Sequence, residues 1–311
     1  VIEESLITLC GKHHIDLKIY GKYTNNLPFA GEYSYELLLS ALSKFLNIPL
    51  KQSESLTLPT LPVRPPFLCA GCPHRASFYA VKKAMRGKDA LFTGDIGCYT
   101  LGNAKPLDMV DTCLCMGAGV TMAQGLKRTN QNHHLFAFIG DSTFFHSGIT
   151  GIINAVYNQT PMTLVVLDNH TTAMTGHQPH PGTGCTMMGE VSSVIDIATL
   201  LKGCGVQKIY EQNPLELEKA VAVVQEASSF NGVSAIIFKS PCIAVTKPEK
   251  PVCITENCVN CKVCIKEIGC PALSLIHGKV TLEPSLCTGC GLCTHVCPKH
   301  AIEKGGNNHE A

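Results

Sequence analysis

Short apolar runs alternate with amphipathic segments through the middle of the chain. The runs predict strands, which we place at Ala90–Thr93, Leu135–Ile139, Thr163–Leu167, Val206–Tyr210 and Ser234–Lys239. The segments with helical periodicity predict helices around His74–Met85, Ala118–Arg128, Ser147–Tyr157, Val194–Lys202 and Pro214–Ser228. This alternation predicts an α/β domain with a doubly wound, mostly parallel sheet. In such a sheet, ligands bind at the carboxyl ends of the strands.

Residues 1–60 have a weaker pattern. We predict a strand near Ile15–Tyr20 and a helix near Tyr35–Leu46. The chain opens at Val1 inside an apolar segment, so we expect a longer N-terminal portion to precede it. Residues 1–60 would then be a partial domain and a linker, which the prolines between Pro59 and Pro66 predict to be stiff.

A second break falls at Thr246–Pro251, where prolines and charges replace the apolar pattern. It predicts an α/β domain over residues 61–246 and a cysteine-rich module over residues 247–311. We expect this module to fold around its own cofactors and to be a small α+β domain.

Composition narrows the class of protein. The chain has 311 residues, of which 45% are hydrophobic, and a formal net charge of +1. These values allow one sizeable core plus a small module, and they give no reason to expect nucleic acid or an anionic membrane as a partner. We see no secretory leader and no apolar run long enough to cross a bilayer, so we expect a cytoplasmic protein with reduced cysteines.

The cysteine-rich module contains one four-cysteine pattern twice. Three cysteines at intervals of three residues are followed by a fourth before a proline, at Cys258, Cys261, Cys264 and Cys270 and again at Cys287, Cys290, Cys293 and Cys297. Thiolates at this spacing bind one cubane, and the fourth cysteine closes the neighbouring one. We therefore expect two [4Fe–4S] clusters in a ferredoxin-like domain, held by Cys258, Cys261, Cys264 and Cys297 and by Cys270, Cys287, Cys290 and Cys293.

Zinc ligation and disulfide bonding are the alternative roles for these cysteines. Zinc ribbons also pair cysteines in C-x2-C units, although they seldom run three such cysteines in a row before Cys-Pro. A disulfide framework needs an oxidising compartment. A repeated ligand pattern is more specific than a single match, and it favours the clusters.

Polar residues follow two of the predicted strands. Gly140-Asp141-Ser142-Thr143 comes after one strand, and Asp168-Asn169 comes after the next. A carboxylate and an amide oxygen at neighbouring strand ends could hold Mg2+ against a diphosphate, and the amides of the following helix could bind phosphate oxygens. The alternative is that both pairs are ordinary turn formers.

These residues resemble the thiamine diphosphate motif, in which Gly-Asp-Gly is followed at a distance by Asn. Here Ser142 stands in place of the second glycine. The resemblance implies that Mg2+ is bound by the side chains of Asp141 and Asn169 and by the carbonyl of Thr171. It implies cofactor contacts at Gly140, Asp141, Ser142, Asn169, Thr171 and Met174.

Longer stretches resemble one family of thiamine enzymes, the 2-oxoacid:ferredoxin oxidoreductases. They are Leu68–Arg75, Gly94–Gly102, Asp111–Gly119, Gly140–Thr143 and Asp168–Gly182, and they are most similar to the C-terminal half of the alpha subunit in the indolepyruvate branch. The resemblance implies oxidative decarboxylation of an aryl 2-oxoacid to an acyl-CoA, with electrons passing through the clusters to ferredoxin. It implies as partners an N-terminal pyrimidine-binding half or another subunit that supplies the activating glutamate, a smaller beta subunit, ferredoxin, the 2-oxoacid and coenzyme A.

The resemblance also implies a third, proximal [4Fe–4S] cluster beside the thiamine. Its expected ligands are Cys69, Cys72, Cys98 and Cys242. The alternative is that some of these are ordinary buried thiols. We expect the other cysteines to be structural: Cys10, Cys113, Cys115, Cys185, Cys204 and Cys253.

Four further residues are candidates for binding or catalysis. His177 and His180 lie where related enzymes usually have Thr-Gly-Gly-Gln and the residues after it, and we predict that they orient a carboxylate or shuttle a proton. Surface histidines are the alternative. His74 and Arg75 could meet a phosphate or substrate carboxylate, and a surface salt bridge of Arg75 is equally compatible.

Two other functions stay open. One is the same chemistry on pyruvate, a branched-chain 2-oxoacid or 2-oxoglutarate. The other is an electron-transfer subunit with a vestigial thiamine site, against which the intact Asp141 and Asn169 argue.

Overall fold

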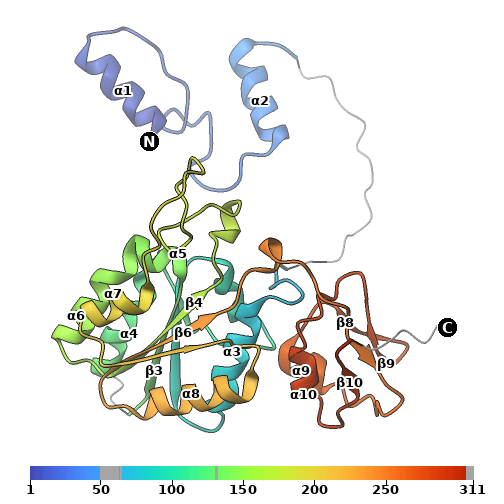
Figure 1. Cartoon of the computed structure of the whole chain (residues 1–311). Helices are drawn as coiled ribbons and strands as arrows, with labels where there is room; N and C mark the ends of the chain where they lie inside the picture. Colours follow the sequence, from blue (N-terminus) through green and yellow to red (C-terminus); the bar gives the residue numbers. More distant parts are fainter. Residues whose placement is uncertain (50–62, 64, 130–131, 306–311) are drawn as a thin grey trace. The chain divides into compact units, whose positions relative to one another are not determined.

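The computed structural model describes residues 1–49, 63, 65–129 and 132–305. The chain forms two compact units, Val1–Arg64 and Pro65–Ala311, and each is described by itself (Figure 1). Within the described ranges, no helix has the length and apolar character that crossing a membrane requires.

The N-terminal unit contains two helices, α1 (Ile2–Lys12) and α2 (Tyr35–Leu46). The predicted helix is confirmed at α2, where the Ser34 hydroxyl accepts a hydrogen bond from the Leu37 amide (3.3 Å). The predicted strand at Ile15–Tyr20 is wrong, because this largely exposed segment pairs with no strand in the described part of the chain. The linker predicted at Pro59–Pro66 lies mostly outside the described residues.

The larger unit is built on a six-stranded sheet with the strand order β2-β1-β3-β4-β6-β5. All neighbouring strands are parallel. The strands are β1 (Ala90–Gly94), β2 (Thr112–Cys113), β3 (His134–Gly140), β4 (Met162–Asp168), β5 (Lys208–Gln212) and β6 (Val233–Lys239). The predicted parallel sheet is confirmed, with β5 beginning two residues later than expected. The pattern missed β2 because a strand of two residues has no recognisable period.

Helices cover both faces of the sheet. One face carries α3 (Pro73–Ala84) and α8 (Leu217–Ser229), and the other carries α4 (Ala118–Thr129), α6 (Ile149–Tyr157) and α7 (Ile197–Gly203). Alternate residues of β3 show the division. Phe136 and Phe138 join the core under α3 and α8, while Leu135, Ala137 and Ile139 join the opposite core. The doubly wound arrangement is therefore confirmed.

Three helices begin elsewhere than predicted, among them α8, which starts at Leu217 rather than near Pro214. The helix expected at Ser147 starts directly after β3, as α5 (Asp141–Thr143), a π-helical turn (Phe144–Gly148) and α6 in one continuous run. The π turn departs from the 3.6-residue period, which hid the first turns from the pattern. α7 begins at Ile197 because the Asp196 carboxylate caps it, accepting from the Thr199 amide at 2.7 Å.

The C-terminal residues form a small α+β module, as predicted. It contains the helices α9 (Val263–Ile268) and α10 (Leu292–Val296), the antiparallel hairpin of β8 (Leu273–Ile276) and β9 (Lys279–Leu282), and the antiparallel pair of β7 (Cys253–Ile254) and β10 (Ile302–Glu303). Its buried residues continue the core that underlies α3 and α8. Because residues 65–311 form one compact unit, the boundary predicted near residue 246 stays a prediction.

Gly119 in α4 offers a test of this packing. An added Cβ would lie 3.0 Å from the carbonyl carbon of Gly94 in β1, whose backbone cannot move without distorting the sheet. We expect Gly119→Ala to lower the free energy of unfolding by about 1–3 kcal/mol through overpacking. Gly125→Ala is the matched control on the same helix, because nothing lies within 4 Å of its Cβ position. Anaerobic thermal unfolding of both variants measures the difference, and equal midpoints would contradict the close approach of α4 to β1.

Candidate functional site

A pocket lies at the carboxyl ends of β1, β3 and β4. It is lined by Ile96–Tyr99 after β1, by Gly140–Thr143 after β3, and by residues of the loop after β4. The predicted cofactor contacts all line this pocket: Gly140, Asp141, Ser142, Asn169, Thr171 and Met174. The parallel sheet thus brings together residues from separate parts of the chain, as expected for the strand ends of this fold.

Gly140 is needed because Tyr99 packs against the end of β3. A Cβ at Gly140 would lie 2.7 Å from the Cε1 atom of Tyr99. The hydroxyl of Tyr99 donates to the carboxylate of Asp95, which also accepts from the Gly117 amide at 2.6 Å. Burial raises the pKa of Asp95 to about 6, although these hydrogen bonds oppose the shift. Asp95 and Tyr99 were not predicted as site residues, since their only signal was their position in the polar loop after a predicted strand.

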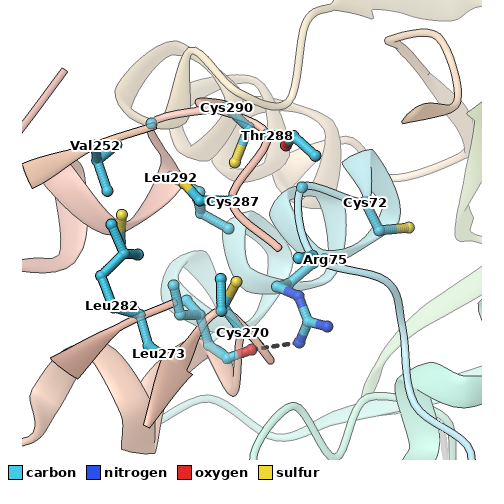
Figure 2. Close-up of a pocket in the computed structure, with 16 residues that line it drawn as sticks. Cys72, Arg75, Val252, Cys270, Leu273, Leu282, Cys287, Thr288, Cys290 and Leu292 are labelled. Atoms are coloured by element: carbon cyan, nitrogen blue, oxygen red, sulfur yellow. Dashed lines mark hydrogen bonds between the residues drawn. The ribbon is translucent and has the colours of Figure 1, made fainter. Parts of the chain in front are cut away.

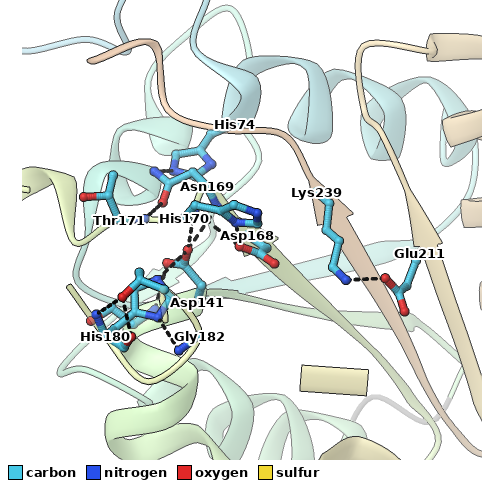
Figure 3. A network of polar contacts seen from close by, with 12 residues as sticks. His74, Asp141, Asp168, Asn169, His170, Thr171, His180, Gly182, Glu211 and Lys239 are labelled. Atoms are coloured by element: carbon cyan, nitrogen blue, oxygen red, sulfur yellow. Dashed lines mark hydrogen bonds and ion pairs between the residues drawn. The ribbon is translucent and has the colours of Figure 1, made fainter. Parts of the chain in front are cut away.

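The Asp141 carboxylate connects the ends of β3 and β4. Its Oδ1 accepts from the Ser142 amide at 2.8 Å. Its Oδ2 accepts from the amides of Asn169 (3.0 Å) and His170 (2.8 Å) (Figure 3). Asp141 is buried, so these amides replace the water that would otherwise solvate its charge.

Three acceptor oxygens meet beside Asp141. The Asn169 Oδ1 lies 2.8 Å from the Thr171 carbonyl oxygen and 3.3 Å from the Asp141 Oδ2. Oxygens without a proton between them repel at these distances unless a cation joins them or the amide is reversed. Neighbouring oxygen ligands of octahedral Mg2+ lie roughly 2.9 Å apart, since each lies roughly 2.1 Å from the metal. In this orientation of the amide, the two distances from the Asn169 Oδ1 lie near that value, so the three predicted ligands could share one ion.

His74 contacts the Asn169 amide. Its Nε2 lies 3.3 Å from the Asn169 Nδ2. Burial lowers the pKa of His74 to about 4, so the ring is neutral. One neutral tautomer accepts a hydrogen bond from the amide in the orientation shown. The other would donate to the oxygen of a reversed amide, whose nitrogen would then donate to the Thr171 carbonyl and the Asp141 Oδ2. His74 also lines the cofactor pocket, and its predicted contact with a phosphate or carboxylate stays a prediction.

A second set of donors shares Asp141. The side chains of Asp141, Asp168 and His170 lie close enough together to bind one ion. The Asp168 Oδ1 is instead paired with the His170 Nδ1 at 2.6 Å, and this hydrogen bond raises the pKa of the half-exposed His170. Mg2+ prefers oxygen ligands to imidazole nitrogen. The set formed by Asp141, Asn169 and Thr171 therefore fits Mg2+ better.

The structure separates the two predicted catalytic histidines. His180 is buried, stacks on Phe145 with 5.6 Å between ring centroids, and places its Nε2 3.1 Å from the Asp141 Oδ2. His177 is exposed on the loop after β4. Neither lines the pocket. Their predicted catalytic roles stay predictions, while the observed contact of His180 is with Asp141.

Both roles considered for Arg75 are wrong. Its side chain is buried and donates to backbone carbonyls, so it is neither a surface salt bridge nor free to bind a phosphate or carboxylate. The sequence held no signal of this, because two of the carbonyls belong to Ile268 and Gly269 in the cysteine-rich module.

The predicted proximal cysteines come from the same rim of the sheet. Cys69 and Cys72 lie just before α3, Cys98 follows β1 and lines the cofactor pocket, and Cys242 follows β6. Burial raises the pKa of the Cys98 thiol, and the neighbouring Cys242 and Cys69 add to the shift. The Cys242 amide donates to the Asn169 carbonyl at 2.9 Å. The cysteines and the predicted metal ligands are thus neighbours.

The eight cysteines of the C-terminal module that we predict to bind clusters line two cavities. One is lined by Cys270, Cys287, Cys290 and Cys293, together with Cys72 and Arg75 (Figure 2). The other is lined by Cys258, Cys261, Cys264 and Cys297. These are the two ligand sets that the spacing predicts. Within the described residues, none of these sets is close enough to hold a single ion, which fits a cubane better than zinc.

The chain is similar to known proteins in both regions. Residues 95–238 match the family described as thiamine pyrophosphate enzyme, C-terminal TPP binding domain, and residues 280–303 match the 4Fe-4S binding domain. The indolepyruvate oxidoreductase subunit IorA of Archaeoglobus fulgidus is 41% identical over 306 residues, which cover 94% of this chain and 49% of that subunit. This chain is an IorA homologue. The predicted family resemblance is confirmed.

A second IorA subunit, from Methanothermobacter marburgensis, is 38% identical over 98% of this chain and 50% of its own length. The chain thus spans about half the length of the IorA subunits that it matches. A solved 2-oxoglutarate:ferredoxin oxidoreductase from Magnetococcus marinus shares the fold with a TM-score of 0.51 and 19% identity, over 59% of this chain and 67% of that chain. The IorA homologue therefore has the predicted thiamine diphosphate-binding and 4Fe-4S-binding domains.

Two carboxyl-to-amide changes distinguish the possible ion sites in the IorA homologue. We expect Asp141→Asn to weaken Mg2+-dependent binding of thiamine diphosphate by more than about tenfold. Even the loss of a residue that only hydrogen-bonds to a metal ligand typically lowers metal affinity by about that factor. Asp168→Asn is the matched control, and its effect should be several times smaller because Asp168 pairs with His170. Isothermal titration calorimetry with and without a chelator measures both. Equal losses in the two variants would assign the ion to the set containing Asp168 and His170.

Proposed function

We propose that this chain is the thiamine- and cluster-bearing part of a 2-oxoacid:ferredoxin oxidoreductase that acts on an aryl 2-oxoacid. One observation supports this most directly. Cys98 lines the cofactor pocket, and Cys72, from the same expected cluster, lines the cavity of Cys270, Cys287, Cys290 and Cys293. The proposed proximal cluster would therefore adjoin the thiamine site and the C-terminal module.

In this proposal, Asp141, Asn169 and the Thr171 carbonyl hold Mg2+ and so fix the diphosphate at the ends of β3 and β4. The spacing of their oxygens supports the assignment. The amides of the helical run that begins at Asp141 would bind phosphate oxygens, because they have no partner in the preceding strand. Met174, which lines the pocket, would pack against the cofactor.

The clusters give the reaction its electron path. When bound, thiamine diphosphate stabilises the charge left as a 2-oxoacid loses carbon dioxide, and the clusters accept the two resulting electrons singly. We propose that electrons pass from the proximal cluster to the cluster held by the set containing Cys270. From there they pass to the cluster held by the set containing Cys258. Cys261 of the last set is exposed, which supports an exit for electrons to ferredoxin there.

The complete activity requires more than this chain in our proposal, since the chain spans about half the length of the IorA subunits. A pyrimidine-binding half or another subunit would supply the glutamate that activates thiamine. A smaller beta subunit, coenzyme A and ferredoxin would complete the reaction to an acyl-CoA. His177 is proposed to orient the substrate, because its exposed loop continues from the pocket residue Met174.

The proposed aryl substrate rests on the names of the IorA relatives. The same chemistry on pyruvate, a branched-chain 2-oxoacid or 2-oxoglutarate is the alternative. An electron-transfer subunit with a vestigial thiamine site is a further candidate. It is disfavoured because the predicted Mg2+ ligands Asp141, Asn169 and Thr171 come together in the pocket, with oxygens close enough to share one ion.

Iron content tests the number of clusters. We expect about twelve irons and twelve acid-labile sulfides per anaerobically purified chain, since each cubane has four of each. Cys98→Ala should reduce both to about eight, because one proximal ligand is lost. Cys204→Ala is the control from the cysteines expected to be structural and should leave the content unchanged. About eight irons in the unchanged chain would remove the proximal cluster from the proposal.

Substrate competition tests the reaction. In a complex assembled with the pyrimidine-binding part and the beta subunit, we expect coenzyme A-dependent reduction of ferredoxin to be at least about tenfold faster with indolepyruvate than with pyruvate or 2-oxoglutarate. Differences in how an apolar pocket accepts side chains support selectivity of this size. A preference for a small or acidic 2-oxoacid would move the assignment to the alternative substrates. Failure of every 2-oxoacid would favour the electron-transfer subunit.

A further inference from the structure

Arg75 is a buried cation without an acidic partner. Only 4% of its surface is exposed, and no carboxylate in the described part of the chain forms an ion pair with it. A buried charge is costly unless other groups compensate it. Since a guanidinium stays protonated in proteins, the compensation must come from its surroundings.

The terminal nitrogens of Arg75 connect two segments that are far apart in sequence. Its Nη1 donates to the carbonyls of Ile268 (2.6 Å) and Gly269 (3.0 Å), which are free at the end of α9. Its Nη2 donates to the carbonyls of Leu68 and Cys69. The guanidinium therefore joins the loop of Cys69 and Cys72 to the loop that precedes Cys270.

The remaining nitrogen belongs to a side chain that lines the cysteine cavity. The Nε of Arg75 is buried and has no hydrogen-bond partner among the described residues. Arg75 lines the cavity of Cys270, Cys287, Cys290 and Cys293, and Cys72 lines the same cavity. Burial lowers the pKa of Arg75, and the thiolates of Cys270, Cys72, Cys290 and Cys69 would oppose that shift. These belong to the two ligand sets that the electron path would join.

We propose that Arg75 is a positioning residue for electron transfer between the proximal cluster and the cluster held by Cys270, Cys287, Cys290 and Cys293. The inference rests on the proposed function. Arg75 holds the two cysteine loops together, and its positive charge and free Nε–H raise the reduction potential of the second cluster. One electron leaves the proximal cluster and reduces the second, whose added negative charge the guanidinium stabilises. Hydrogen bonds and charge near cluster sulfurs are general means of setting such potentials.

The test compares Arg75→Met and Arg75→Lys in the anaerobically purified full chain. Met removes the charge and the donors at similar length, while Lys keeps the charge and loses the Nε–H. Redox titration followed by electron paramagnetic resonance should show one cluster at a more negative potential in Arg75→Met. A smaller shift of the same sign is expected in Arg75→Lys. The iron content and the potential of the cluster held by Cys258, Cys261, Cys264 and Cys297 should not change.

Arg86→Met is the matched control. Arg86 also bridges to the cysteine-rich module, through Glu267 at 2.8 Å, but its side chain is 63% exposed. A surface contact of this kind should shift no potential. If Arg75→Met loses iron, the cluster potentials of Arg75→Lys test the inference instead, because lysine keeps the positive charge in the buried site.

The results separate this inference from the proposed function. Wild-type potentials in an iron-replete Arg75→Lys or Arg75→Met would overturn the role of Arg75 and leave the proposed clusters intact. Equal shifts of all clusters, or a similar shift in Arg86→Met, would also overturn it. An unchanged chain that binds zinc or lacks the clusters would contradict the proposed function itself.

Discussion

The parallel alignment of β1, β3, β4 and β6 is the constraint on which both candidate sites depend. It directs the carboxyl ends of all four strands to one edge, so that loops distant in sequence meet there. Asp141 at the end of β3 accepts from the first amides after β4, and the Cys242 amide after β6 donates to the Asn169 carbonyl. The predicted Mg2+ ligands and Cys242 are therefore held by one hydrogen-bonded backbone.

The first turn of α3 contacts both the predicted thiamine site and the cysteine-rich module. His74 contacts Asn169, and Arg75 contacts the end of α9. Successive residues of a helix point about 100° apart, so two residues that are adjacent in sequence can contact different parts of the structure. Burial lowers the pKa of both side chains, but only the imidazole loses its charge. The neutral His74 can accept a hydrogen bond from an amide, whereas the charged guanidinium of Arg75 contacts carbonyls and lines a cavity of cysteines.

Most elements of the sheet domain could be predicted because their burial imposes a period on the sequence. β3 and β4 are buried along almost their whole length, and α8 buries Leu217, Ala220, Val224 and Ala227 at helical spacing. Prediction failed where burial imposes no regular period on the sequence. Ile15–Tyr20 has apolar residues but no partner strand, β2 is too short to show a period, and the π turn after Asp141 departs from the helical repeat.

The sequence by itself determined which cysteines group in the C-terminal module and which strand ends carry the polar residues of the pocket. Both follow from local spacing, since a short loop can wrap a cluster and a strand must end before its polar loop. Only the tertiary structure decided what His74, His180 and Arg75 contact. Arg75 donates to the carbonyl of a residue 193 positions away. The residues next to Arg75 in the sequence are equally compatible with a phosphate ligand, so they do not indicate this contact. Packing of the cysteine-rich module against α3 made that choice, because the buried guanidinium requires acceptors, which the end of α9 provides together with the carbonyls of Leu68 and Cys69.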